Sequence, residues 1–345
     1  MKKTFYILDH LFLPTPYNHR FFVEKFAAGF APHGFDVKLV RHVEEITEPG
    51  FVMISCHNFF YNSIWGIRML RADVTRFLHP IKWIPGHDVF YSAAYADGVL
   101  GIVAERLQIR VLKQLAKKKD IVVIAWASSL VYVMERLGMP YLVSGEYYRT
   151  EIPRTSPVWE WYRLYLKDRK AIPYPLSANV HPDEVGEGCV NEKYEICYIG
   201  NKNYHPEYYG PFLNNPRAKI FPTPPYVKEE TRVDVYKNSM VSLGLSDASN
   251  IENRMVTERV VESLAYGALC FSDNPAAPEA TDGCAIFVKD KKDLLERLTY
   301  YVSHKKEREE LRQRGFDFIR KKGTNYHRAV EFIERAKELY QPVFL

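Results

Sequence analysis

The sequence lacks the features that would place it at once in a membrane, disulfide-rich or nucleic-acid-binding class. It has no run of about 18 apolar residues, the length of a membrane-spanning helix, so no transmembrane segment is expected. Its five cysteines are scattered and form no C-x-x-C pair, which argues against a disulfide framework and a structural zinc site. The excess of 47 Lys and Arg over 42 Asp and Glu is too small for a nucleic-acid footprint. We therefore expect a globular protein of a reducing, cytoplasmic compartment.

The N-terminal apolar stretch also lacks the marks of a signal peptide. It is broken by Asp9 and His10, and no small-residue cleavage site follows, so we interpret it as a first strand. The length of 345 residues fits two domains of about 100–200 residues each. We place an N-terminal domain at residues 1–170 and a C-terminal domain at 171–325. The remaining residues, 326–345, form a predicted helix expected to cross back to the N-terminal domain.

Short apolar runs alternate with longer amphipathic segments in both halves of the chain. Runs typical of buried strands lie at residues 4–8, 35–40, 51–55, 82–85, 120–127 and 140–143, and again at 194–199, 218–221, 240–245, 268–272 and 285–288. Strands separated by helices predict a parallel sheet with helices on both faces. We therefore expect an α/β chain with two Rossmann-like, doubly wound domains. Ligands of such sheets bind beyond the carboxyl ends of the strands.

One segment, residues 250–275 (NIENRMVTERVVESLAYGALCFSDNP), combines several features of a phosphate-binding helix start. Thr257 is a predicted N-cap, and the N–H groups that follow it form a natural anion site. Arg259 adds a bidentate donor for a diphosphate oxygen. Glu258 and Glu262 share a helix face with Arg259, and Glu262 can accept both hydroxyls of a ribose. The competing interpretation is an ordinary helix–turn–strand with an exposed Glu-Arg-Glu face.

This segment resembles the donor-binding stretch of GT-B glycosyltransferases, in particular the CgeB-like members of the group-1 set. Residues 194–201 (YEICYIGN) resemble the first strand and glycine turn of their C-terminal domain. Residues 236–245 (YKNSMVSLGL) resemble the strand before the donor loop, and 324–329 (TNYHRA) their closing helix. The likeness spans residues 190–335. It implies a GT-B fold with an interdomain cleft, and transfer of a sugar from a nucleotide sugar to a glycan, polysaccharide or lipopolysaccharide acceptor.

Two departures from that family bear on the chemistry. Retaining GT-B enzymes commonly carry two glutamates eight residues apart, whereas the position eight before Glu262 is Arg254. Residues 253–259 (NRMVTER) are instead similar to the Y-V-T-E-K string of α-1,3-fucosyltransferases, which are inverting enzymes that use a GDP-sugar. That likeness implies that Glu258 and Arg259 hold the donor ribose and phosphate. It favours inversion slightly and leaves hexosyl and fucosyl transfer both open.

The resemblance implies a donor site made of strand-end and helix-start residues, namely Gly200, Asn201, Lys202, Asn250, Thr257, Glu258, Arg259 and Glu262. The sequence contains no D-x-D motif. Because a metal-bridged nucleotide sugar needs close carboxylates, we predict metal-independent transfer. Arg259, Lys202 and a helix N-terminus would neutralise the leaving diphosphate. No cofactor is expected beyond the UDP- or GDP-linked co-substrate.

An inverting transfer also needs a general base on the acceptor hydroxyl. The candidates lie at predicted strand ends in the N-terminal half, and they are Glu146, His87, Asp88, His57 and Asp9. Glu146 ranks first because the sequence SGEYYR places aromatic residues beside a carboxylate. The stretch 159–167 (WEWYRLYLK) fits either an interdomain packing helix or peripheral contact with a membrane. A non-enzymatic two-lobed sugar- or nucleotide-binding protein and a GT-B-fold sugar-nucleotide epimerase are the alternative functions.

Overall fold

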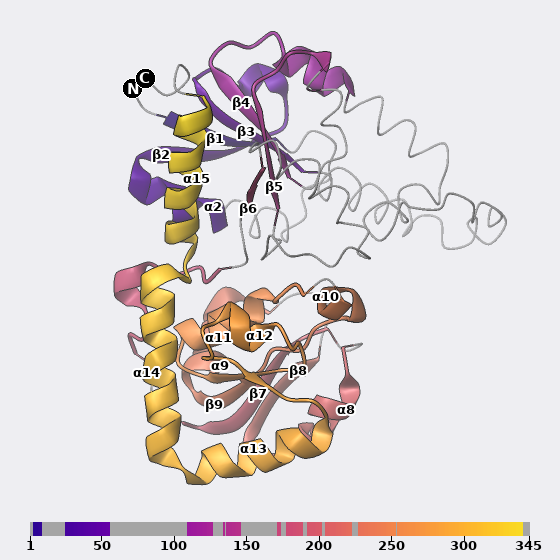
Figure 1. Cartoon of the computed structure of the whole chain (residues 1–345), viewed down its shortest axis with the longest axis vertical. Helices are drawn as coiled ribbons and strands as arrows, with labels where there is room; N and C mark the ends of the chain where they lie inside the picture. Colours follow the sequence, from indigo (N-terminus) through magenta and orange to yellow (C-terminus); the bar gives the residue numbers. More distant parts are fainter. Residues whose placement is uncertain are drawn as a thin grey trace, which may run out of the picture. The chain divides into compact units, whose positions relative to one another are not determined.

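The chain forms two compact units (Figure 1). The computed structural model describes residues 3–8, 25–55, 109–126, 134, 136–145, 171–173, 177–188, 192–201, 204–222, 227–252 and 254–340. The first unit comprises Met1–Gly145, Thr150–Tyr174 and Ala329–Leu345, and the second comprises Glu146–Arg149 and Pro175–Arg328. Each unit is built on a parallel sheet, which confirms the predicted α/β class.

The sheet of the first unit has six strands in the order β2-β1-β3-β4-β5-β6. They are β1 (Lys3–Leu8), β2 (Phe35–Val40), β3 (Gly50–Ser55), β4 (Ile121–Trp126), β5 (Tyr141–Gly145) and β6 (Ala171–Pro173). Successive residues alternate between two cores, with Phe5 and Phe51 on one face and Tyr6 and Val52 on the other. Burial on both faces explains why these strands appear in the sequence as continuous apolar runs.

Three further elements of the first unit are short: α2 (Lys25–Phe30), η2 (Ala31–His33) and η3 (Val43–Glu45). Strand β6 was not predicted, since it has three residues and ends at a proline, a residue that marks a chain break in sequence analysis. The predicted strand at residues 82–85 lies outside the described residues.

The sheet of the second unit has five parallel strands in the order β11-β10-β9-β7-β8. They are β7 (Tyr194–Gly200), β8 (Ala218–Pro222), β9 (Ser239–Leu243), β10 (Leu269–Ser272) and β11 (Ile286–Phe287). All five were predicted within two residues of these bounds. Both sheets are doubly wound, because their strand order runs outward in two directions from an inner strand.

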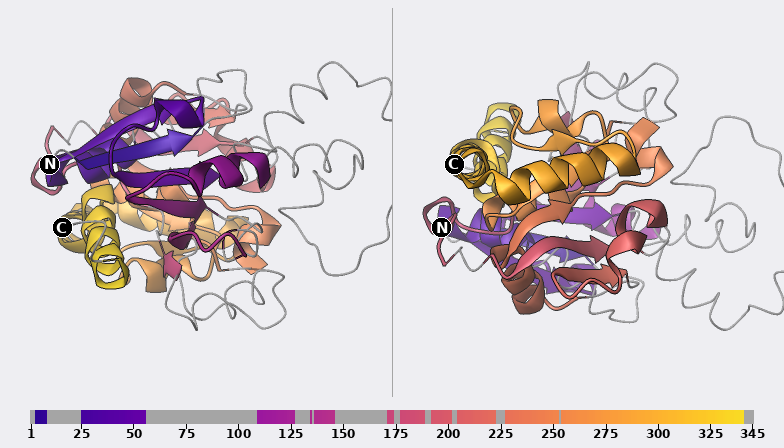
Figure 2. Two further views of the ribbon diagram at one scale, coloured as in Figure 1. Left: turned by 90° about the horizontal axis from the view of Figure 1, so that it is seen from above. Right: turned by 90° about the horizontal axis from the view of Figure 1, so that it is seen from below.

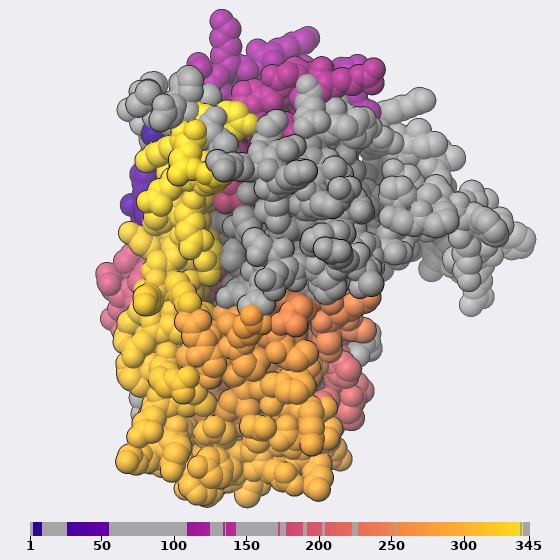
Figure 3. All heavy atoms as spheres, viewed as in Figure 1, coloured from indigo at the N-terminus to yellow at the C-terminus, as the bar shows by residue number. Residues whose placement is uncertain are grey.

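Helices cover both faces of the second sheet. They are η5 (Pro182–Glu184), α8 (Pro206–Tyr209), η6 (Gly210–Phe212), α9 (Glu229–Lys237), α10 (Ala248–Glu252), α11 (Glu258–Ala265), α12 (Ala277–Ala280), α13 (Lys291–Ser303) and α14 (Lys305–Lys322). Helices α9, α11 and α12 lie on one face of the sheet, and α13 lies on the other (Figures 1 and 2). Residues of α14 form part of the outer surface of this unit (Figure 3). The helices that sequence analysis missed, α8, α10 and α12, are too short to show a helical period.

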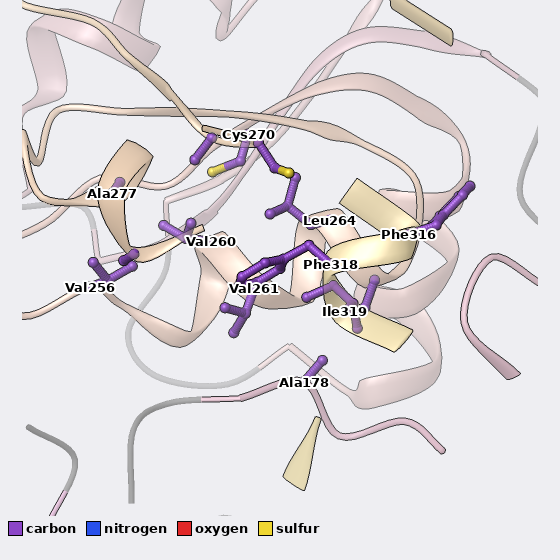
Figure 4. Packing of buried hydrophobic residues seen from close by; sticks show 14 of the residues in the cluster. Ala178, Val256, Val260, Val261, Leu264, Cys270, Ala277, Phe316, Phe318 and Ile319 are labelled. Atoms are coloured by element: carbon purple, nitrogen blue, oxygen red, sulfur yellow. The ribbon is translucent and has the colours of Figure 1, made fainter. Parts of the chain in front are cut away.

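Helix α11 is fixed by a buried apolar cluster (Figure 4). Val260, Val261 and Leu264 belong to this cluster together with Phe316 and Ile319 of α14. Burying side chains of this size contributes about 1.5–3 kcal/mol each. The position of the α11 N-terminus is therefore set by the packing of its apolar side chains.

The last helix, α15 (Asn325–Leu339), starts in the second unit and continues in the first. In the first unit Phe332 lies 5.8 Å from Phe30 and 5.4 Å from Phe51 between ring centroids. The hydroxyl of Tyr340 donates to the carbonyl of Tyr141 at 2.5 Å. The part of α15 from Ala329 to Ala336 is thus part of the core of the N-terminal unit.

Candidate functional site

The strand order of the second sheet reverses at β7. Strand β8 pairs on one side of β7 and β9 pairs on the other. In doubly wound sheets, ligands bind outside the carboxyl ends of the strands at this switch point. The segments that follow β7 and β9 meet this condition, and the segment that follows β10, the neighbour of β9, lies at the same edge. Described polar residues of these segments include Asn201, Tyr204, His205, Ser246, Asp247, Asp273 and Asn274.

Arg259, in the first turn of α11, reaches this edge. Its Nη2 donates to the carbonyl of Leu245, just after β9, at 2.6 Å. Its guanidinium carbon lies 5.7 Å from the centroid of the Tyr204 ring, after β7, and Tyr204 in turn donates its hydroxyl to Asp247 at 3.2 Å. The structure therefore holds the arginine between the ends of the two switch-point strands by a hydrogen bond and a cation–π contact.

The hydroxyl groups of Ser246, shortly after β9, and of Thr257, directly before α11, are buried without a hydrogen-bond partner. Thr257 occupies the N-cap position with extended backbone, but its hydroxyl makes no capping bond. The predicted N-cap position is therefore confirmed, whereas the predicted capping hydrogen bond of the hydroxyl is absent. Buried polar atoms of this kind are uncommon and need an explanation, such as a ligand.

Glu262 faces helix α9 rather than solvent. It is 2% exposed, and its Oε1 lies 2.7 Å from Nη2 of Arg232. Burial raises the pKa of the Glu262 carboxyl, the Arg232 guanidinium opposes this rise, and the charge of Glu258 adds to it. Arg259 and Glu262, which were predicted to share a helix face, thus have different partners. Arg259 contacts the carbonyl of Leu245, and Glu262 contacts Arg232. The role of Glu262 as a ribose ligand stays a prediction.

The remaining predicted residues, which include donor-binding residues and the candidate general bases, fall in two groups. Gly200 and Asn201 close β7, where the Tyr198 hydroxyl donates to the Asn201 carbonyl at 2.7 Å. A Cβ at Gly200 would meet that hydroxyl at 2.5 Å, so the turn needs glycine. Asn250 lies in α10, and its backbone N–H donates to Asp247 Oδ1 at 2.7 Å. The second group lies outside the described residues and consists of Lys202, His87, Glu146, Asp88, His57 and Asp9.

Sequence analysis missed the roles of the residues that follow β10. Asn274 is fully buried, donates to the carbonyl of Met255 at 2.8 Å and accepts from the N–H of Ala276 at 3.0 Å. It therefore ties the end of β10 to the segment that leads into α11. Asp273 accepts from the backbone N–H of Ser246 at 2.9 Å. The polar string Asp-Asn-Pro directly after a buried strand was the signal in the sequence that could have indicated these roles.

Among the described residues, no three or more His, Cys, Asp or Glu side chains are grouped so that they could hold a metal ion. In the same residues, no helix combines the length and the apolar character that crossing a membrane requires.

Comparisons with known proteins bear on the fold and on the C-terminal half of the chain. Residues 204–334 match the model of a family described as glycosyl transferase-like. No sequence among the curated proteins matches the chain. None of the findings bears on the likeness to α-1,3-fucosyltransferases, which stays a prediction.

Solved structures match over almost the whole chain. A UDP-forming α,α-trehalose-phosphate synthase from Burkholderia xenovorans shares 10% identity, with 98% of this chain and 99% of that one covered and a TM-score of 0.58. UGT2 of Phytolacca americana, complexed with UDP-2-fluoro-glucose and pterostilbene, shares 10%, with 98% and 99% covered and a TM-score of 0.53. A trehalose-6-phosphate synthase studied for glycosyltransfer with retention shares 9%, with 97% and 99% covered and a TM-score of 0.54.

At these identities the structural matches show the fold. The chain therefore has the two-domain α/β fold of GT-B glycosyltransferases, and its residues 204–334 carry a glycosyl transferase-like domain.

Proposed function

We propose that the protein transfers a sugar from a UDP- or GDP-linked donor to a glycan, polysaccharide or lipopolysaccharide acceptor, and that the switch-point edge of the second sheet binds the donor diphosphate. The observation that carries the proposal is the placement of Arg259 at this edge, on the first turn of α11. A guanidinium has five N–H donors, and its bond to Leu245 engages one nitrogen. The helix N-terminus adds partial positive charge at the same place.

Replacement of Arg259 by alanine tests this proposal. Because charge-assisted hydrogen bonds contribute about 1.5–3 kcal/mol, we expect nucleoside diphosphate affinity to fall by about tenfold to a hundredfold. Thermal unfolding with UDP, GDP, dTDP and CMP identifies the base, and calorimetry of the best nucleotide measures the loss. The matched control is Arg254→Ala, since Arg254 lies in the preceding loop and forms a half-exposed ion pair with Glu279.

The two arginine variants separate a binding role from a general charge effect. The proposal holds if Arg254→Ala keeps the affinity of the unaltered protein while Arg259→Ala loses it. Equal losses in both variants would contradict it, and so would a melting temperature that none of the four nucleotides raises.

We also infer metal-independent transfer with inversion, supported by the missing D-x-D motif and by the NRMVTER string. The trehalose-6-phosphate synthase is described as transferring its sugar with retention. At 9% identity, the similarity supports a shared fold but not a shared stereochemistry. The anomeric configuration of the product, read by NMR from a reaction containing EDTA, decides both points. A retained configuration, or loss of turnover in EDTA, would overturn the corresponding inference.

A further inference from the structure

Asp273 is a buried carboxylate whose hydrogen bonding the protein leaves incomplete. Its side chain is 4% exposed. The N–H of Ser246 lies 2.9 Å from Oδ1 and 3.3 Å from Oδ2, and the backbone N–H of Asp273 itself is a second donor. An ionised carboxylate has about four acceptor sites, and a buried charge is costly unless it is well paired. Burial raises the pKa of Asp273 to about 6, and this rise is opposed by the Ser246 N–H, His205 and Arg259.

The imidazole of His205 faces the same carboxylate without a direct hydrogen bond. Its Nε2 lies 3.7 Å from Asp273 Oδ2, and its Nδ1 lies 3.0 Å from Glu207 Oε1. The backbone of His205 has φ 43°, a left-handed conformation that costs a non-glycine residue energy and is often found at functional sites. One hydroxyl group can accept from an imidazole N–H and donate to a carboxylate at once. A single hydroxyl oxygen beside this pair can therefore reach both Nε2 and Oδ2 within hydrogen-bond distance.

This pair adjoins the phosphate-binding arginine. The carbonyl of Leu245 accepts from Arg259, and the N–H of the next residue, Ser246, donates to Asp273. A carboxylate repels a phosphate oxygen but accepts readily from an uncharged hydroxyl. Asp273 therefore suits a hydroxyl group on the part of the donor that is joined to the diphosphate.

We infer that Asp273 and His205 bind a hydroxyl group of the donor sugar, and so help to decide which sugars are accepted. This inference rests on the proposed donor site. Ribose hydroxyls share the same chemistry, so the experiment compares nucleotides with and without the sugar.

The test measures the affinities of UDP and UDP-glucose, and of GDP and GDP-fucose, by calorimetry. For Asp273→Asn we expect the nucleotide sugar to bind about tenfold to a hundredfold more weakly, since a charge-assisted hydrogen bond is lost. The affinity of the nucleoside diphosphate alone should change by less than about twofold. His205→Gln should likewise weaken binding of the nucleotide sugar but not of the nucleoside diphosphate. Because the His205 side chain is 36% exposed, this variant should fold even if Asp273→Asn does not.

Asp247→Asn is the matched control. Asp247 follows β9 at the same edge, but its two oxygens are used by Asn250 N–H and the Tyr204 hydroxyl. We expect this variant to bind both ligands of a pair with equally changed affinity.

The outcomes separate the inference from the proposal beneath it. Equal weakening of nucleotide and nucleotide sugar in Asp273→Asn and His205→Gln would overturn the sugar subsite, and so would unchanged binding of both. If the unaltered protein binds no nucleotide at all, the donor site itself is refuted.

Discussion

The polar side chains at the switch point are held mainly by backbone groups of neighbouring loops. Arg259 donates to the carbonyl of Leu245, and Asn274 donates to that of Met255. Asp273 accepts from the N–H of Ser246. Backbone N–H and C=O groups are common to almost all residue types, so these contacts leave no pattern of paired residue types in the sequence. The site is therefore defined by loop positions more than by a motif.

At the residue scale, the raised pKa of Asp273 predicts a pH dependence of stability. Its folded-state value of about 6 lies above the ordinary value of about 3.9. Between these values the folded state binds more protons than the unfolded state, so stability falls as the pH rises through this window. Asp273→Asn removes this slope. Urea unfolding from about pH 4 to pH 7 should show the variant gaining up to about 3 kcal/mol relative to the unaltered protein, and a constant difference would contradict the shift.

At the element scale, a buried ion network fixes α14. Arg308 is 2% exposed and donates from Nε and Nη2 to Glu192, just before β7, at 3.0 and 2.8 Å. Arg312 donates to the same carboxylate at 3.0 Å and to the carbonyl of Gly267, at the end of α11, at 2.7 Å. Burial opposes ionisation of Glu192, but the hydrogen bonds from both arginines lower its pKa. The network thereby links α14 to the segments that lead into β7 and β10.

Loss of the shared carboxylate should leave the buried guanidinium of Arg308 without an anion, while Arg312 keeps its ion pair with Glu309. We expect Glu192→Gln to lower the free energy of unfolding by about 3–5 kcal/mol, because a buried pair broken on one side leaves an uncompensated charge. The control Glu310→Gln removes an exposed ion pair with Lys306 within α14 and should cost less than about 1 kcal/mol. Chemical denaturation of both variants gives the comparison, and similar losses would show that burial of the network is unimportant.

At the scale of the whole molecule, α15 starts in one unit and finishes in the core of the other. Phe332 of this helix belongs to the aromatic cluster under β1 and β3. We expect Phe332→Ala to destabilise the first unit by about 3–5 kcal/mol. Hydrogen exchange should accelerate in β1, β3 and β4 and stay unchanged in β7, β9 and β10. Glu334→Ala, an exposed position of α15, is the control, and acceleration in both sheets would contradict a local effect.

The sequence by itself determined the strands and the class of fold. Parallel strands buried on both faces must be continuous apolar runs, and runs such as 194–199 and 268–272 therefore marked β7 and β10 within a residue or two. It also marked Arg259 as a residue at a helix start. It did not predict β6, which ends at Pro173, and it assigned to Thr257 a capping bond that the structure does not contain.

Only the tertiary structure decided which side chains meet. His205 and Asp273 are far apart in the chain, as are Glu192 and Arg308, and they come together because parallel strands bring their carboxyl ends to one edge and α14 folds back along the sheet. Local propensity and hydrophobic period describe contacts within a few residues, so they do not predict pairs that are far apart in the chain. The strand order that creates the switch point, β7 between β8 and β9, is likewise a product of the packed sheet and not of any segment alone.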